Sequence, residues 1–240
     1  MKTKTFYIII LIAIVAIAAS PAAVKKETRQ AAPFEAIFNS GGIDVIFTES
    51  ASYSITVEAD EDILKEIITE VSSGVLTVKR KSNFNGFNLF NRKGWSVKVH
   101  VSAPRLREIR ASGGADFIAE KVTCDADCHI DLSGGADVKI NSLTVNGSTK
   151  VSASGGADCT IKALRTTDAD FDASGGADIS IELEATGKIS CSASGGADIS
   201  LSGKADTVKA NASGGADVNI RRLTRNHAET HKSGGGDVYQ

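Results

Sequence analysis

The chain has 240 residues, with 27 Lys and Arg against 29 Asp and Glu and a net charge of −2. The near balance hides a split, because residues 112–220 carry 16 acidic and 8 basic side chains, whereas residues 61–111 carry 5 and 10. A basic block beside an acidic body favours partner binding or self-association. Because no basic stripe follows the chain, we exclude nucleic acid as a partner.

Residues 1–23 have the layout of a secretory signal peptide. Two lysines precede an apolar run from Phe6 to Ala19, and small residues follow it. The run has roughly 14 residues, which is short for a membrane span. We predict cleavage at Ala22 or Ala23 and no membrane span afterwards, with a retained N-terminal anchor as the alternative. The chain is then exported to the periplasm, the outer surface or the extracellular space.

Residues 24–32 are expected to form a linker, and the region 33–111 to form irregular coils. Alternating apolar residues predict strands here, in 39–50, 53–60, 74–81 and 95–104. The stretch ADEDILKEIITEV (59–71) places five apolar residues on one helical face behind an acidic start, so we expect a short helix. That helix, or the edge at 34–39, would cover the open N-terminal end of the stack.

An aromatic segment interrupts this strand pattern between residues 81 and 95. Its Asn- and Gly-rich sequence holds Phe84, Phe87 and Phe90 and ends on Trp95, the only tryptophan. These four residues are our candidate ligand contacts, for a glycan, a lipid interface or a protein. The alternative is that the loop folds back and buries its aromatic rings over an open end of the fold.

The second half repeats the motif Ser-Gly-Gly-Ala-Asp, with Gly replacing Ala in the seventh copy. Successive repeat serines are 19 to 21 residues apart, at Ser112, Ser133, Ser154, Ser174, Ser194, Ser213 and Ser233. A fixed period in this range is typical of a solenoid, whose units bury their apolar faces only by stacking. Within one period, three short alternating runs are separated by polar or glycine turns, which indicates strands. We therefore predict an all-β, β-helix-like solenoid with roughly triangular coils of about 20 residues over 112–240.

The glycine pair of each motif is expected to make a corner that needs positive φ and lets adjacent coils approach closely. Flanking Ser and Asp side chains would accept hydrogen bonds from nearby backbone N–H groups. Val, Ile, Leu, Ala and Cys fill the predicted interior, with Phe117 and Phe171 as its large members.

Stacking would place the seven motif aspartates in one column with a rung every ~4.8 Å. Two carboxylates at ~5 Å repel by about 0.8 kcal/mol in bulk water, so backbone donors, protonation or cations must offset the column. Backbone hydrogen bonding is the interpretation we favour, and a calcium ladder is the alternative. The aspartates in question are Asp116, Asp137, Asp158, Asp178, Asp198, Asp217 and Asp237.

Four cysteines and two histidines are candidates for redox or metal sites. Only Cys124 and Cys128 are close enough in sequence for a disulfide, but we favour unpaired thiols, and we interpret Cys159 and Cys191 as small buried apolar residues. His227 and His231 have the spacing of a helical metal pair but lie where strands are expected. The spacing in CDADCH (124–129) departs from the usual zinc patterns. No catalytic set emerges from these spacings, and we expect no cofactor.

The sequence resembles the auto-transporter adhesin head GIN domain, a family of exported bacterial proteins. The resemblance rests on FEAIFNSGGIDVIFTES, YSITVEADEDILKEIITEV, GVLTVKRK and VKVHVSAPRLREIRASGGADF, followed by the tandem repeats, and covers 33–240. It implies a right-handed β-helix-like fold, similar in outline to pectin-lyase-type solenoids without their catalytic residues. It also implies a role in cell adhesion or another surface function.

We therefore predict a non-enzymatic, exported binding module that recognises a glycan or a cell-surface protein. Two other functions stay open. One is a calcium-assisted, polysaccharide-active enzyme that uses the aspartate column. The other is a structural solenoid that self-associates into homo-oligomers through its basic and acidic regions.

Overall fold

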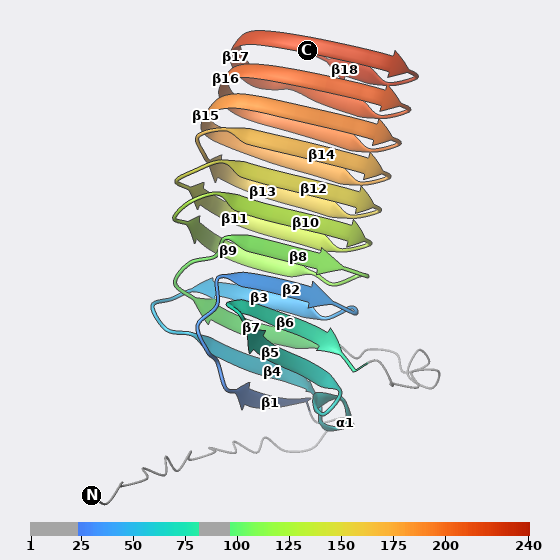
Figure 1. Cartoon of the computed structure of the whole chain (residues 1–240). Coiled ribbons are helices and arrows are strands. Elements are labelled where there is room, and N and C mark those ends of the chain that lie inside the picture. Colours follow the sequence, from blue (N-terminus) through green and yellow to red (C-terminus); the bar gives the residue numbers. More distant parts are fainter. Residues whose placement is uncertain (1–23, 82–96) are drawn as a thin grey trace, which may run out of the picture.

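The computed structural model describes residues 24–81 and 97–240 and shows a stack of coils built almost entirely from strands. Figure 1 shows the chain winding from the N-terminal strands at the bottom to the C-terminal coil at the top. Each coil takes about 20 residues, which confirms the predicted solenoid. Within the described ranges, no helix reaches the length and apolarity that crossing a membrane requires.

Each coil of the repeat region has two long faces. The first, called the serine face below, is made of β8 (Glu108–Ser112), β10 (Cys128–Gly134), β12 (Thr149–Gly155) and β14 (Ala169–Gly175). The opposite aspartate face is made of β9 (Phe117–Cys124), β11 (Asp137–Val145), β13 (Asp158–Arg165) and the last strand, β18 (Asp237–Tyr239). Three long strands cross from the aspartate face to the serine face, namely β15 (Asp178–Gly195), β16 (Asp198–Gly214) and β17 (Asp217–Gly234).

Neighbouring coils pair in parallel and in register, so equivalent residues of successive repeats stack into columns. Ser154 lies between Ser133 and Ser174 on the serine face, and Asp158 pairs with Asp178 on the aspartate face. In Figure 1 the serine-face strands run rightward on the near side and the aspartate-face strands run leftward behind them, while the chain rises. The coil is therefore right-handed, as the family resemblance implied.

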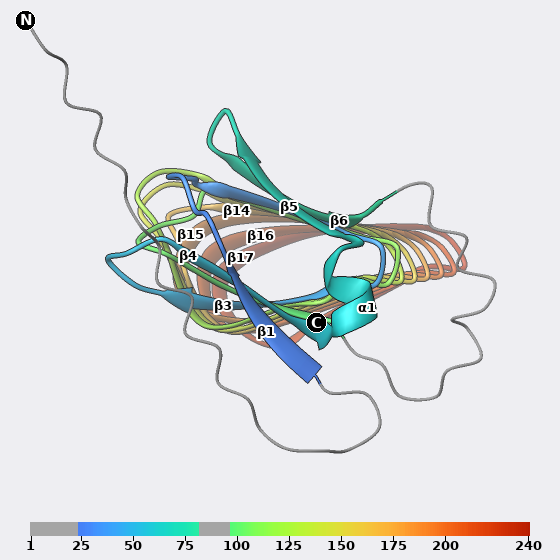
Figure 2. The same ribbon diagram turned by 90° about the horizontal axis from the view of Figure 1, so that it is seen from below.

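Seen end-on in Figure 2, the coils are elongated loops with two long sides. On the aspartate-face side the inward–outward alternation breaks once in each strand, where two outward residues follow each other, as at Asn141–Ser142 in β11 and Lys162–Ala163 in β13. This break divides that side into two short runs. Together with the serine-face strand, it gives each coil the three runs that the alternation predicts.

The glycine pair forms the corner between the two faces. The first glycine of the pair has positive φ, for example +77° at Gly175 and +77° at Gly195. The second glycine donates its N–H to the first glycine of the preceding coil, with 2.6 Å from the nitrogen of Gly176 to the oxygen of Gly155. The prediction of a positive-φ corner with closely approaching backbones is confirmed.

Between the faces lies one continuous apolar core. Alternation sends every second side chain of each strand inward, where Val, Ile, Leu, Ala and Cys fill the section. Phe117 and Phe171 are both 0% exposed, as predicted for the large interior residues. Small alanines beside the corner glycines bring the two faces together at that end of the coil.

The first half continues the same stack in a less regular form. β2 (Ala36–Ser40) pairs in parallel with β8 and with β6 (Val75–Arg80), and β3 (Asp44–Glu49) pairs in parallel with β9 and with β7 (Lys98–Ala103). Antiparallel strands then follow, because β4 (Ser54–Asp60) pairs with β7 and β5 (Ile67–Ser72) pairs with β6. The strands predicted in 39–50, 53–60, 74–81 and 95–104 are present.

The helix expected over 59–71 is wrong beyond its first turn. Only α1 (Glu61–Leu64) is helical, and it buries Ile63 and Leu64. The rest becomes β5, because a Ser73–Gly74 turn with φ values of 51° and 76° folds it back on β6. Its residues include Ile, Thr and Val, whose branched side chains suit a strand, and the hairpin supplies ladder hydrogen bonds that the helical pattern could not reveal.

The segment expected as a linker also differs, since β1 (Val24–Arg29) pairs antiparallel with β4. Its side chains are mostly exposed and show no apolar alternation, so the sequence gives no strand signal. The backbone edge of β4 and the Arg29 side chain hold it in place. Arg29 donates from Nη2 to the oxygen of Leu64 at 2.8 Å and from Nη1 to that of Ile67 at 3.2 Å.

Candidate functional site

A groove with a cavity volume of about 680 Å³ lies on the serine face. It crosses β8, β10, β12, β14 and β15 and continues over β2 and β6 at its N-terminal end. The strands run across it, so the groove follows the solenoid axis. Its outward-facing lining residues are Phe38, Ser40, Thr77, Arg110, Ser112, Asp131, Ser133, Ser152, Ser154, Asp172, Ser174, Ser192 and Ser194.

Two columns of side chains make up most of this lining. The serine column contains the motif serines, extended by Ser40, which pairs with Ser112. The central column lies two residues earlier in each strand and contains Arg110, Asp131, Ser152, Asp172 and Ser192 in register. Residues at i and i+2 of a strand project on the same side, so both columns line the groove. Serine side chains are short, which leaves room above the sheet.

Some hydroxyls of the serine column also bind the neighbouring backbone. Ser154 donates from Oγ to the oxygen of Leu132 at 3.3 Å, and Ser213 donates to the oxygen of Ala193 at 3.5 Å. The expectation that motif serines accept hydrogen bonds from backbone N–H groups is therefore wrong for these two, because their hydroxyls donate to carbonyl oxygens of the preceding coil. The hydroxyl oxygens keep acceptor capacity toward a ligand.

The N-terminal end of the groove breaks the repeat with an aromatic and a cation. Phe38 of β2 pairs in register with Arg110 of β8, and the guanidinium lies 4.5 Å from the centre of the Phe38 ring. Arg110 also donates from Nε to Oε1 of Glu108 at 2.6 Å and lies 3.5 Å from a carboxylate oxygen of Asp131. Its charge is therefore shared between two carboxylates.

The two carboxylates of the central column have nearly equivalent surroundings. The Asp131 side chain is 47% exposed and faces Arg110, while that of Asp172 is 45% exposed and lies 3.3 Å from Nζ of Lys150. The hydrogen bonds that Lys150 donates to Asp170 and Asp172, followed by the charges of these carboxylates, raise the pKa of Lys150, so this lysine stays charged beside them. Paired catalytic carboxylates need environments that separate an acid from a base, and these two do not provide them.

The predicted aspartate column forms on the opposite face. Six members, Asp137, Asp158, Asp178, Asp198, Asp217 and Asp237, stack in register. Asp116 adjoins Asp137 at the N-terminal end of the column. Outer members find cations, since Asp137 lies 2.9 Å from Lys139 and Asp237 lies 3.1 Å from Lys232.

Backbone donors offset part of the repulsion within this column. Burial raises the pKa of Asp178, as do the carboxylates of Asp158 and Asp198, while a hydrogen bond from the Asp198 backbone lowers it. Burial and the charges of Asp137 and of a neighbour from β3 likewise raise the pKa of Asp116. Among residues 24–81 and 97–240, no three His, Cys, Asp or Glu side chains gather as a metal site would require.

The other candidates fall in different places. Phe84, Phe87, Phe90 and Trp95 lie outside the described residues. Cys124 and Cys128 are both buried as free thiols at the corner between β9 and β10.

The two histidines remain on the surface of β17. His231 lies 2.8 Å from Glu229 through Nε2, and its side chain is 62% exposed. His227 lines a second cavity of about 630 Å³ on the serine face together with Lys150, Lys188 and Lys209. Acidic residues also line this cavity, so its cations and anions are intermixed.

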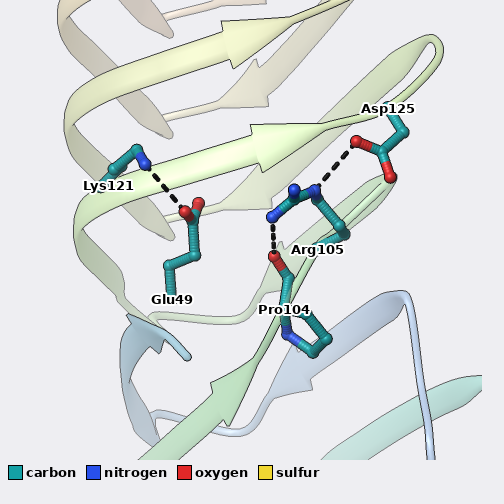
Figure 3. A network of polar contacts seen from close by, with 5 residues as sticks. All are labelled: Glu49, Pro104, Arg105, Lys121 and Asp125. Carbon is teal, nitrogen blue, oxygen red and sulfur yellow. Dashed lines mark hydrogen bonds and ion pairs between the residues drawn. The ribbon is translucent and has the colours of Figure 1, made fainter. Parts of the chain in front are cut away.

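Figure 3 shows a polar network where the irregular coils meet the first repeat. Lys121 lies 2.9 Å from Glu49, and Arg105 donates to Asp125 at 2.9 Å and to the Pro104 oxygen at 2.7 Å. Burial alone would raise the pKa of Glu49. Hydrogen bonds from Lys121 and from a neighbouring threonine, with the charges of Lys121 and Arg105, instead hold that pKa below its ordinary value. The Lys121–Glu49 and Arg105–Asp125 pairs therefore connect the irregular coils to the first repeat.

The groove was missed because we interpreted the motif serines only as corner residues. A second polar position two residues before each motif serine was the available signal, as in Ser152-Ala153-Ser154 and Ser192-Ala193-Ser194. The contribution of Phe38 could not be found from sequence spacing. It depends on the pairing of β2 with β8, more than 70 residues away in the chain.

Comparison with known families agrees with this architecture. The model of the family described as "Putative auto-transporter adhesin, head GIN domain" matches residues 33–158 and 142–239. The chain belongs to this family. No curated protein matches it. The head GIN assignment confirms the resemblance drawn from the strand and repeat motifs.

Solved structures share the head GIN fold at low sequence identity. A "putative adhesin" from Parabacteroides merdae ATCC 43184 is 20% identical, with a TM-score of 0.70 over 90% of this chain and 95% of that one. A second, from Bacteroides fragilis NCTC 9343, is 17% identical, with a TM-score of 0.71 over 90% and 96%. A "putative lipid binding protein" from Parabacteroides distasonis ATCC 8503 is 15% identical, with a TM-score of 0.65 over 90% and 96%. At these identities the likeness establishes the fold alone.

Proposed function

We propose that the chain is an exported, non-enzymatic adhesion module that binds surface molecules through the groove of the serine face. The observation that carries this proposal is the groove itself, which presents hydrogen-bonding side chains from seven strands along one side of the stack. Solenoids characteristically use extended surfaces of this kind to bind partners. The adhesin description of the family supports the same role.

Two further observations favour binding over catalysis and export over retention. Asp131 and Asp172 are too alike in exposure and in pairing to act as acid and base. The lysine pair, apolar run and small residues of 1–23 favour export. An exported module with a long polar groove suits attachment to another surface.

Bead adhesion tests this proposal. Beads coated with the purified chain are counted on epithelial cells, mucin and bacterial cell layers, together with beads carrying Ser192→Tyr or Ser200→Tyr. Both serines are half-buried in parallel ladders, but Ser192 lines the groove and Ser200 lies on the aspartate face. A tyrosine at 192 should fill the groove and abolish retention, whereas a tyrosine at 200 should not change it.

Equal melting temperatures of the two variants would show that neither substitution disrupts the fold. Retention of Ser192→Tyr beads at the wild-type level would contradict the groove as the contact surface. Failure of wild-type beads on every surface would contradict the adhesion role.

A further inference from the structure

The groove presents its side chains at a spacing that matches the repeat length of an extended polymer. Each coil contributes one strand, called a rung below, and successive rungs are spaced about 4.8 Å along the axis. This spacing is comparable to the length of one sugar ring in an extended glycan. Five rungs, from Arg110 to Ser192, form the regular part of the central column. A ligand that repeats at this interval would meet one motif serine at each step.

The lining chemistry is suited to hydroxyl groups. Serine Oγ atoms both donate and accept, and the carboxylates of Asp131 and Asp172 accept two hydrogen bonds or more. Arg110 and Lys150 supply donors beside those carboxylates. Sugars carry neighbouring hydroxyls that use donors and acceptors together, whereas a peptide backbone offers them in a different, alternating geometry.

Charge argues against an anionic polymer in the groove. The cations in and beside the groove each already contact two carboxylates, since Arg110 at its N-terminal end faces Glu108 and Asp131, and Lys150 next to it faces Asp170 and Asp172. An added anion would have to compete with these existing pairs. The serine rungs are uncharged, so a neutral ligand avoids that cost.

Apolar side chains are nearly absent from the outward lining. Phe38 is the aromatic in it, placed at the N-terminal end beneath the Arg110 guanidinium. A lipid tail needs a wide apolar surface, which a row of serines and aspartates does not give. One partly exposed ring at the end of a polar groove suits the C–H edge of a sugar.

We propose that the serine-face groove binds a single chain of a neutral polysaccharide lying along the solenoid axis, one sugar unit per coil. Arg110 and Phe38 form the N-terminal end of the site, and Ser152 and Ser192 form its uncharged floor. This assignment rests on the proposed function, because it names the surface molecule that the adhesion module recognises.

Affinity electrophoresis tests the ligand class directly. The chain is run through gels containing mixed-linkage β-glucan, α-mannan or dextran, and through gels containing polygalacturonate. Retardation is expected in a neutral polysaccharide and should be absent in polygalacturonate. Raising the salt from about 0.1 to about 1 M shortens the Debye length from ~10 to ~3 Å and should change the retardation by less than about twofold.

Matched variants then locate the site. Ser152→Tyr and Ser192→Tyr should weaken binding about tenfold or more, while Ser200→Tyr on the aspartate face should stay within about twofold of wild type. In calorimetry with oligosaccharides of the retarding polymer, affinity should rise with length up to about five units, one per rung, and then level off.

Several outcomes would overturn the inference. They are binding to polygalacturonate alone, binding to phosphatidylcholine vesicles in place of neutral polymers, or retardation that Ser192→Tyr leaves unchanged. Beads that adhere through the groove although none of the neutral polymers retards the protein would refute the ligand class and leave the adhesion proposal standing. If the wild-type protein neither adheres to any surface nor is retarded by any neutral polymer, both the adhesion proposal and the polysaccharide proposal are refuted.

Discussion

The corner of each repeat can be tested with two adjacent glycines that differ in backbone conformation. Gly175 has a φ of +77°, and a Cβ added there would lie 3.0 Å from the oxygen and 3.1 Å from the nitrogen of Gly155. Gly176 has no positive φ, and an added Cβ would lie 3.6 Å from that same oxygen, an ordinary contact. The two substitutions to alanine therefore change the same volume at the same corner, with different predicted costs.

The cost at Gly175 has two parts. A left-handed conformation costs an L-residue roughly 1–2 kcal/mol. The close Cβ adds to this, because the Gly155 backbone that it meets is fixed by the hydrogen bond from Gly176 at 2.6 Å. We expect Gly175→Ala to lose about 2–4 kcal/mol of unfolding free energy in total. For Gly176→Ala, reduced entropy of the unfolded chain should offset any local strain, so the change should stay within about 1 kcal/mol.

Thermal unfolding followed by far-ultraviolet circular dichroism measures this difference. For a chain of 150–250 residues, each 1 kcal/mol shifts the melting temperature by roughly 2–4 °C, so Gly175→Ala should melt roughly 5–15 °C below wild type. Gly176→Ala should melt within a few degrees of wild type. Equal losses for both variants would refute the argument, since packing volume and not φ would then determine the corner.

Three other predictions concern the core and the aspartate column. Burial and the carboxylates of both flanking coils raise the pKa of Asp178, so its stabilising contribution is present below the unfolded pKa and is lost as pH rises through the folded one. Asp178→Asn should therefore raise the melting temperature at pH 7 and have no effect near pH 2. Because solvent and salt screen the charge repulsion, the gain in unfolding free energy at pH 7 should be a few tenths of a kcal/mol. An equal shift of the melting temperature at both pH values would exclude a charge effect. Burial raises the pKa of Cys159 and of Cys191 to about 12, so iodoacetamide at pH 8 should label neither until urea unfolds the chain, and labelling of the native protein would contradict their burial. Phe171→Ala should cost about 3–5 kcal/mol in urea unfolding, because the ring is 0% exposed in the core; a smaller loss would mean that the coils collapse around it.

The repeat region could be predicted because its local and long-range signals agree. Alternation places Val151 and Ala153 inward, and the 20-residue period then stacks each repeat on the next without further information. The first half lacks that redundancy. The stretch 59–71 fits a helix by its apolar spacing, and only the hairpin with β6 makes its second half, from Ile67, a strand. Similarly, β1 owes its strand conformation to the edge of β4 and not to its own side chains.

The candidate site was harder to predict than the fold. Columns depend on register, and the central column differs from coil to coil, so no sequence motif marks it. The stacking of the motif aspartates in one column was predicted correctly, because these residues belong to the motif that every repeat shares. The Phe38–Arg110 pair needed the parallel pairing of β2 with β8, which brings together the beginning and the end of the irregular region 33–111.

The corner motif and the central column of the serine face differ in how much they vary along the chain, and this difference distinguishes residues needed for folding from residues available for recognition. The corner positions are nearly invariant from coil to coil, as expected where a positive φ and a close backbone approach leave little choice. The central column, two residues before the motif serine, changes at almost every rung, from Arg110 through Asp131, Ser152 and Asp172 to Ser192. A solenoid needs only a polar outward residue there, so the backbone does not impose this variation. Because of this variation, the two ends of the groove differ although the framework is repetitive. A polymer bound along the groove would therefore bind in a single orientation of its chain.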